Sequence, residues 1–200
     1  MLRTGWVRVV AVSLLVAWLS LASNITTQAQ LSGEANTLLA GRLVVSKLLN
    51  SGTIWAGLPI LAGWLVRRPW WAVLAGGVSA ELALVAHYAA GQLLGIFQPG
   101  IWRDNGYWFV FGLFCALLGP IGALARRADW IGLLARLAIP AGALAEPFVV
   151  SMFSRPQILP WPDRFASTAC GVLLLAMGLW GTFFVVRDAA TAHREPVVSE

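Results

Sequence analysis

The sequence predicts an all-α fold: a polytopic transmembrane helical bundle of about six membrane spans, with a short interfacial amphipathic helix. Of the 200 residues, 58% are hydrophobic and only 12% are charged, whereas soluble domains average about 25% charged residues. The mean hydropathy is +0.75. Several charge-free runs exceed the roughly 17 residues that a helix needs to cross a bilayer. They are continuously apolar, unlike the alternating segments of a membrane β-barrel. Six spans follow: Trp6 to Ala22, Asn50 to Val66, Trp70 to Leu94, Gly106 to Ala125, Trp130 to Ser151 and Ala166 to Val186.

The first span permits two interpretations. Arg3 and Arg8 precede its apolar stretch and a polar segment follows it, as in a secretory signal peptide. However, no clear cleavage site with small residues follows, and the charge-free interval up to Glu34 is long enough to cross a membrane. We therefore expect the segment to remain in the protein as a span.

The stretch Ser32 to Leu49 is predicted to form an amphipathic helix with one broad apolar side and a cationic edge formed by Arg42 and Lys47. Such a helix suits the outer membrane interface, but it could equally pack over the bundle as a re-entrant or capping helix. Asn50, Ser51, Gly52 and Pro59 then interrupt the second span.

Two further irregularities are predicted later in the chain. Gly119-Pro120 predicts a bend or break within the fourth span. Three prolines predict an irregular outer loop over 153–165. All 200 residues are expected to form one integral membrane domain, with 187–200 as a short cytoplasmic tail.

The basic residues predict the topology. If the chain threads six times, eight basic residues lie on the side that holds both termini: Arg3, Arg8, Arg67, Arg68, Arg126, Arg127, Arg187 and Arg194. The opposite side holds five: Arg42, Lys47, Arg103, Arg155 and Arg164. Short loops rich in arginine stay in the cytoplasm, so both termini are predicted to be cytoplasmic in the inner membrane. Tryptophans near the predicted span ends fit an aromatic belt at the headgroups.

Several classes of protein are excluded or disfavoured. Cys115 and Cys170 lie in apolar runs, which is no basis for a disulfide scaffold. The basic residues stand singly or in pairs beside spans, so nucleic acid is not an expected partner. No pair of His or Cys has the spacing of metal ligands, and no catalytic motif occurs. We expect no metal, no cofactor and no enzymatic activity.

An internal repeat is indicated at an offset of 59 residues. Leu65 to Trp71 aligns with Leu124 to Trp130, and Gly63 aligns with Gly122. Each copy is a glycine-bearing span, an arginine pair, a turn and a tryptophan that starts the next span. The copies share one orientation, so a duplication would place its axis along the membrane normal. Shared constraints on hairpin ends could also produce this pattern.

Ionisable residues inside spans are the best indicators of function, because each costs about 2.5 to 3.5 kcal/mol to place centrally. Glu81 lies near the middle of the third span. It could handle a proton or bind a cation, or it could simply donate an interhelical hydrogen bond as a protonated acid. Tyr88 lies seven positions on, over the same helical face, and could reach the same cavity.

Three more ionisable groups complete the candidates. Glu146, which aligns with His87 in the repeat, could bind a cation or amine beside the carbonyl freed by Pro147, or it could reach interfacial water. A lone histidine such as His87 is more often a packing residue than a ligand. Arg136 is expected to extend to the cytoplasmic surface rather than form a buried ion pair. The candidate solute or proton site is therefore Glu81, His87, Tyr88 and Glu146.

Glycine and alanine at spacings of three, four and seven are expected to let helices approach closely. Asn50-Ser51-Gly52 with Trp55 and Gly63, then Gly119-Pro120-x-Gly122 and Glu146, resemble a family of small bacterial multi-pass membrane proteins known only as a domain of unknown function. The resemblance covers roughly 31–186 and implies a bacterial cytoplasmic-membrane protein without implying an activity. A weaker architectural likeness is to the six-helix substrate-capture subunits of vitamin importers.

Two functions follow as hypotheses. The first is a structural or accessory protein that packs in the lipid bilayer against a membrane protein partner or a second copy of itself. The second is a binding or transport protein for a small solute, proton or cation, whose ligand the sequence does not specify.

Overall fold

The computed structural model describes residues 2–192, which form helices and, within that range, no strand. In chain order the helices are α1 (Leu2–Ser23), α2 (Gln28–Leu31), α3 (Asn36–Leu49), α4 (Gly52–Val66), α5 (Pro69–Leu93), α6 (Ile101–Asp104), α7 (Gly106–Phe114), the 3₁₀ helix η1 (Cys115–Leu118), α8 (Gly119–Leu124), α9 (Trp130–Val149) and α10 (Trp161–Ala192). The predicted all-α class is confirmed.

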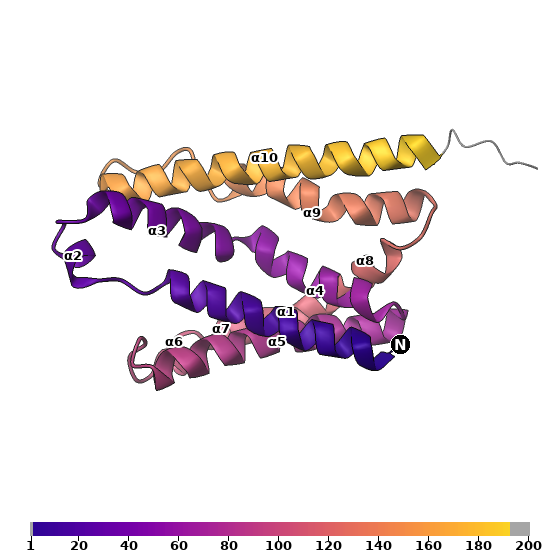
Figure 1. Ribbon diagram of the computed structural model, residues 1–200, viewed down its shortest axis with the longest axis horizontal. Coiled ribbons are helices and arrows are strands. Elements are labelled where there is room, and N and C mark those ends of the chain that lie inside the picture. Colours follow the sequence, from indigo (N-terminus) through magenta and orange to yellow (C-terminus); the bar gives the residue numbers. More distant parts are fainter. Residues whose placement is uncertain (1, 193–200) are drawn as a thin grey trace, which may run out of the picture.

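Six segments are long and apolar enough to cross a membrane, which confirms the predicted multi-pass character. They are Arg3–Ser23, Asn36–Val66, Pro69–Leu93, Gly106–Leu124, Trp130–Val149 and Trp161–Thr191. Figure 1 shows these segments running back and forth along one axis. The N-terminus, the α4–α5 and α8–α9 connections and the end of α10 lie at the same end. The arginine pairs predicted to share one side therefore do so, while Arg194 lies outside the described residues.

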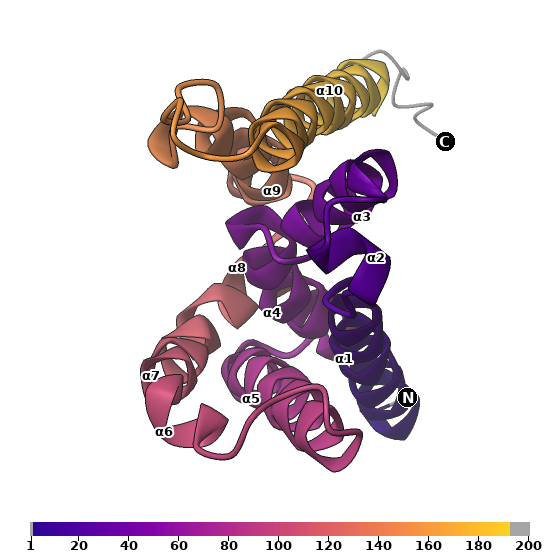
Figure 2. The same cartoon turned by 90° about the vertical axis from the view of Figure 1, so that its left-hand side faces the viewer.

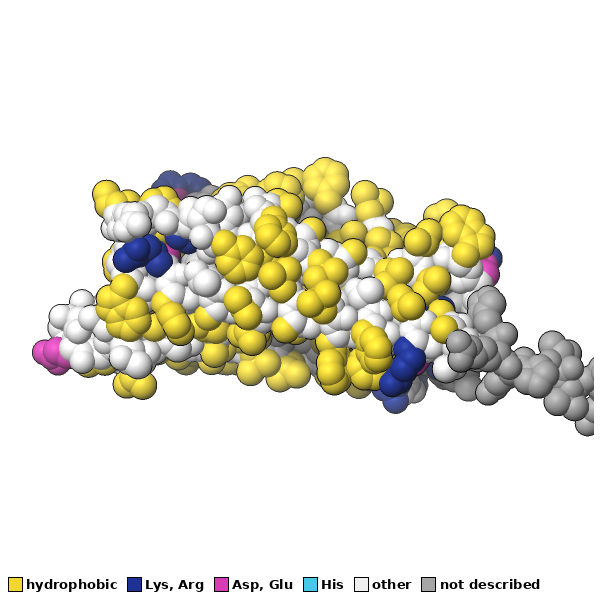
Figure 3. Space-filling model, turned by 90° about the horizontal axis from the view of Figure 1, so that it is seen from above, with side chains coloured by type: hydrophobic (Ala, Val, Ile, Leu, Met, Phe, Trp, Pro, Cys, Tyr) yellow, Lys and Arg dark blue, Asp and Glu magenta, His cyan; other side chains and the backbone are white. Residues whose placement is uncertain are grey.

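Hydrophobic side chains cover much of the outside of the bundle. They dominate the middle of the face in Figure 3, where charged side chains gather toward the ends. Large apolar residues such as Leu38, Leu117 and Trp180 are mostly exposed. A surface of this kind is stable against lipid tails and would be a liability in water.

The second span is longer than predicted, because the amphipathic helix belongs to it. α3 packs against α10 and α1 and leads into α4 through Asn50 and Ser51. Figures 1 and 2 show α3 along the same general axis as the other long helices. An ion pair of 2.9 Å between Lys47 and Asp163 joins the end of α3 to the start of α10.

The last helix is also longer than the predicted span Ala166 to Val186. Pro162 occupies an early helical position, where its missing N–H has no intrahelical partner to lose. α10 consequently begins inside the predicted 153–165 loop. At its other end it continues to Ala192, so the first six residues of the predicted tail, 187–192, are helical.

The predicted break in the fourth span appears as the 3₁₀ turn η1 between α7 and α8. Pro120 has no N–H to donate to the carbonyl four residues earlier, and the Gly119 N–H instead bonds the Ala116 carbonyl. A bent segment results, with α7 on one side of the bundle and α8 against α4.

Glycines bring α4 and α8 into backbone contact, as the spacing of small residues predicts. A Cβ on Gly63 would overlap the Gly119 carbonyl, and a Cβ on Gly122 would overlap the Ile60 carbonyl. A shift of 59 residues carries Ile60 onto Gly119 and Gly63 onto Gly122. The contact of Gly63 with Gly119 therefore corresponds to the contact of Gly122 with Ile60. In the same way, the contact of α5 with α8 corresponds to that of α9 with α4. These contacts correspond under the offset of the predicted repeat, and the duplication itself stays a prediction.

Candidate functional site

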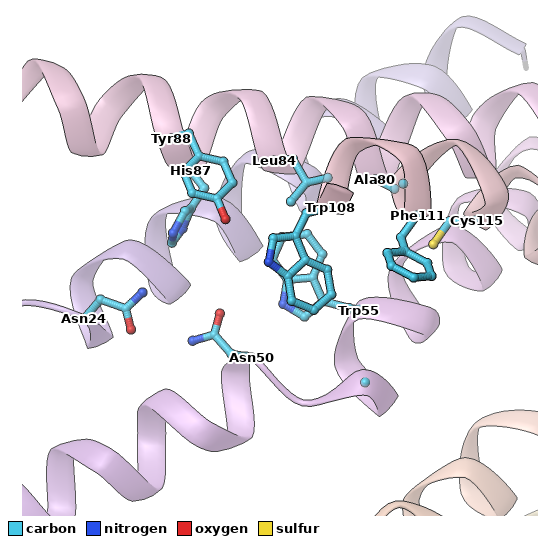
Figure 4. A pocket seen from close by; sticks show the side chains of 12 residues that line it. Asn24, Asn50, Trp55, Ala80, Leu84, His87, Tyr88, Trp108, Phe111 and Cys115 are labelled. Atoms are coloured by element: carbon cyan, nitrogen blue, oxygen red, sulfur yellow. The ribbon is translucent and has the colours of Figure 1, made fainter. Parts of the chain in front are cut away.

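A pocket of about 340 Å³ opens among α1, α4, α5 and α7, in the part of the bundle away from the start of α1 and the end of α10 (Figures 1 and 4). This volume falls in the range of small-molecule sites. Twelve residues line it: Asn24, Asn50, Gly52, Trp55, Ala80, Leu84, His87, Tyr88, Trp108, Phe111, Gly112 and Cys115.

Aromatic rings form much of the wall. Trp55 comes from α4, whereas Trp108 and Phe111 come from α7. Tyr88 stands on α5 with its ring centroid 5.8 Å from that of Phe109. Rings of this kind provide a large and rigid apolar surface for a ligand.

Two asparagines form the polar end of the pocket, and serines hold both in place. The Ser20 hydroxyl donates to Asn50 Oδ1 at 2.7 Å, and Asn50 Nδ2 donates to the Ser46 carbonyl at 2.8 Å. The Ser46 hydroxyl in turn donates to Asn24 Oδ1 at 2.8 Å. The end of α1 and the break between α3 and α4 are therefore joined by one polar network.

The sequence interpretation missed this network, treating Asn50 as an interruption and Asn24 as part of a polar connection. A signal was present, because Ser20 and Asn24 are four residues apart, and so are Ser46 and Asn50. Residues at this spacing share a helix face. That the two faces meet depends on the packing of α1 beside α3.

His87 and Tyr88 both line the pocket, whereas Glu81, with which Tyr88 was expected to share a cavity, does not. His87 is buried, with its Nδ1 3.4 Å from the Ala17 carbonyl oxygen. Its ring meets that of Tyr88 edge-on at 5.2 Å. This carbonyl is the only hydrogen-bond partner of the ring among the described residues. Because a carbonyl can only accept, Nδ1 is the donor. Nε2 of the neutral ring is then an acceptor.

Glu146 is bound to the start of α4 and does not line the pocket. Its Oε1 accepts from the Gly52 N–H at 2.7 Å, and its Oε2 accepts from the Thr53 N–H at 2.7 Å and the Thr53 hydroxyl at 2.6 Å. The Ser51 hydroxyl accepts from the Ile54 N–H. Together they satisfy the first donors of a helix that begins inside a candidate membrane span.

Glu81 also lies outside the pocket lining. Its Oε1 is buried without a hydrogen-bond partner among the described residues, and it packs against Gly112 of α7. A Cβ on Gly112 would overlap this carboxyl group. Because Gly112 and Cys115 line the pocket, Glu81 sits behind its wall and not in it.

Arg136 extends toward the end of the bundle that holds the termini, as predicted. Its Nε donates to the Gly132 carbonyl at 3.2 Å. It borders a second hollow of about 270 Å³ together with Asp129, Trp130 and Asp188. Across residues 2–192, no group of three His, Cys, Asp or Glu side chains is placed to hold a metal ion.

The fold and the pocket define the class: a multi-pass helical membrane protein with an internal small-molecule-sized pocket. In comparison with known proteins, no family model, no curated protein and no solved structure matches the chain. The resemblances to a bacterial family of unknown function and to vitamin-importer subunits stay predictions.

Proposed function

We propose that this protein binds a small solute within the membrane, in the pocket among α1, α4, α5 and α7. The lining supports the proposal: aromatic walls from α4 and α7 enclose an end where Asn24 and Asn50 are held by serines. Apolar walls with a few fixed polar groups are typical of ligand sites. Holding the polar groups in advance lowers the entropic cost of binding.

Proton or cation transport receives less support from the same geometry. Glu146 is engaged by three donors of α4, and Glu81 lies behind the pocket wall. Among residues 2–192, no acidic side chain lines the pocket. A solute that carries no charge suits these surroundings better than a metal ion or ammonium group does.

Native mass spectrometry of mildly extracted protein tests the proposal. We expect the wild-type protein to carry a bound small molecule, and Trp108→Ala to lose it. Trp180→Ala is the matched control, because Trp180 is exposed on α10 and lies outside the pocket. Glu81→Gln is expected to retain the bound mass.

Two results would contradict solute binding. One is wild-type protein that carries no small molecule, and the other is a bound mass that survives Trp108→Ala. A copurifying polypeptide in place of a small molecule would favour the accessory role that the sequence also permits.

We further propose a location in the cytoplasmic membrane of a bacterium, with both termini in the cytoplasm. The arginine pairs at 67–68 and 126–127 support it, because positive loops stay inside. A reporter that is active only in the cytoplasm, fused after Glu200, should be active. An active exported reporter at that position would overturn the orientation.

A further inference from the structure

The pocket offers hydrogen-bond donors that have no partner within the fold. Asn24 Oδ1 accepts from Ser46, but Asn24 Nδ2 donates to no residue in the described range. The indole N–H groups of Trp55 and Trp108 likewise bond no described residue, although both side chains line the pocket. Figure 4 shows the indoles of Trp55 and Trp108 in the middle of the pocket and Asn24 to the left, with Asn50 between them.

Two acceptors of the lining are already engaged. Asn50 Oδ1 takes the hydrogen of the Ser20 hydroxyl, and Asn24 Oδ1 takes that of Ser46. His87 Nε2 remains as an acceptor, and the Tyr88 hydroxyl can donate or accept, since neither has a hydrogen-bond partner among the described residues. The amide of Asn24 and the two indole N–H groups still give the lining more unpaired donors than unpaired acceptors.

In the part of the chain that the structure describes, no Lys, Arg, Asp or Glu side chain lines the pocket. The nearby Arg42 guanidinium donates to the Ser23 carbonyl at 2.8 Å, at the end of α1, and does not line the pocket. A carboxylate ligand would lose its hydration without gaining a cation as partner. An ammonium ligand would be attracted by the ring faces, but beside Asn24 and the indole N–H groups it would bring donors to donors.

We propose that the solute is a neutral, flat and largely apolar molecule whose polar end is a hydrogen-bond acceptor of the carbonyl type. This inference rests on the proposed function and names its substrate class. The two lone pairs of the carbonyl oxygen would accept from Asn24 Nδ2 and the Trp108 indole N–H, while the flat body lies against the rings of Trp55 and Phe111.

Three probes with one aromatic body and different polar ends test the class: 2-acetylnaphthalene, 2-naphthylmethylammonium and 2-naphthoate. Binding is measured by equilibrium dialysis against the full chain in lipid nanodiscs, with empty nanodiscs subtracting partition into lipid. We expect 2-acetylnaphthalene to bind at least about tenfold more tightly than either ion, the ratio expected for about 1.4 kcal/mol of differential solvation.

Two substitutions locate the effect in the pocket. Asn24→Asp keeps an acceptor for Ser46 but replaces the free donor by a carboxylate oxygen, so the preference should reverse toward the ammonium probe. Asn36→Asp is the matched control, because Asn36 begins α3 outside the pocket. Trp108→Phe keeps a ring and removes one N–H, and should weaken 2-acetylnaphthalene binding about three- to tenfold. Trp180→Phe, which lies outside the pocket, should leave 2-acetylnaphthalene binding unchanged.

The outcomes separate the two proposals. Equal binding of the three probes, or tighter binding of an ion, overturns the carbonyl inference and leaves solute binding in place. If no probe binds but native mass spectrometry still finds a small molecule, the carbonyl inference is likewise overturned and solute binding stays. No probe binding and no copurifying small molecule overturns both. Each variant should have the same melting curve as the wild type. A loss of binding then cannot be caused by a loss of folding.

Discussion

Glu146 on α9 and Thr53 at the start of α4 are joined twice, because one carboxylate oxygen accepts from both the N–H and the hydroxyl of Thr53, at 2.7 and 2.6 Å. The two residues are 93 positions apart in the chain. A carboxylate at a helix N-terminus also faces the positive end of the helix dipole. The break between α3 and α4 is therefore stabilised from another helix, and the same break places Asn50 and Gly52 in the pocket lining.

Replacing Glu146 by Gln should destabilise the fold. In glutamine an NH₂ group replaces one of the two carboxylate oxygens, so one N–H of α4 would face a donor and lose its acceptor. Leaving one buried donor unsatisfied costs about 1–3 kcal/mol. Thermal or denaturant unfolding in detergent measures the change. Glu34→Gln, at an exposed position before α3, is the control. Equal effects of the two substitutions would show that Glu146 does not hold α4.

Gly63→Ala should destabilise the crossing of α4 and α8 by about 1–3 kcal/mol or more, because the added methyl group overlaps the Gly119 backbone. Gly57→Ala is a control in the same helix, since its Cβ would find its nearest neighbour, an Ile139 methyl, at 3.7 Å. That control should be neutral or slightly stabilising, because alanine favours helix. Melting temperatures of the two variants test the difference, and a similar result for both would contradict this contact.

The ion pair of Lys47 and Asp163 should contribute little but measurably to the packing of α3 on α10. The two side chains are 26% and 29% exposed, so a coupling energy of about 0.5–1 kcal/mol is expected. A double-mutant cycle with Lys47→Ala and Asp163→Ala measures it. High salt should weaken the coupling. A coupling of zero at low salt would show that the pair is incidental.

Asp129 should make stability depend on pH in the acid range. It caps α9 by accepting from the Gly132 N–H at 3.1 Å. The Arg127 guanidinium, which donates to its carboxylate, is the main cause that lowers the Asp129 pKa, and the Gly132 N–H adds to it. Since the folded pKa lies below the unfolded value, the contribution is present above the unfolded pKa. It is lost as pH falls through the folded pKa.

The melting temperature of the wild type relative to Asp129→Asn measures this contribution. The difference should be constant near neutral pH and shrink in acid. Arg127→Gln should remove most of the pH-dependent part, because the arginine is its main cause. A difference that persists unchanged in acid would mean that the charge of Asp129 does not matter.

The sequence alone predicted the features that depend on local composition. The apolar runs indicated the spans, the arginine pairs indicated which connections share an end, and Gly119-Pro120 indicated a break. It also singled out His87 and Tyr88, which do line the pocket. These succeed because membrane insertion and backbone hydrogen bonding act on short segments of chain.

Other features were misjudged for want of long-range information. The sequence from Asn50 to Gly52 indicated an interruption of the second span. It did not indicate that α3 belongs to the same span, or that Glu146 would accept from the free N–H groups at the start of α4. Glu81 and Glu146 were expected to share a site with His87 and Tyr88. The structure places Glu81 behind the wall and Glu146 on α4.

Composition and pattern determined that this chain is a helical membrane protein of about six spans, and they predict that both ends lie on one side. Only the tertiary structure decided which polar groups are engaged and which face the pocket. Glu146 and Asn24 are both polar residues near span ends, yet one is saturated by the donors of α4 while the other keeps a free donor in the pocket. The physical reason is that hydrogen-bond partners from other helices decide the availability of a polar group, and sequence spacing does not reveal those partners.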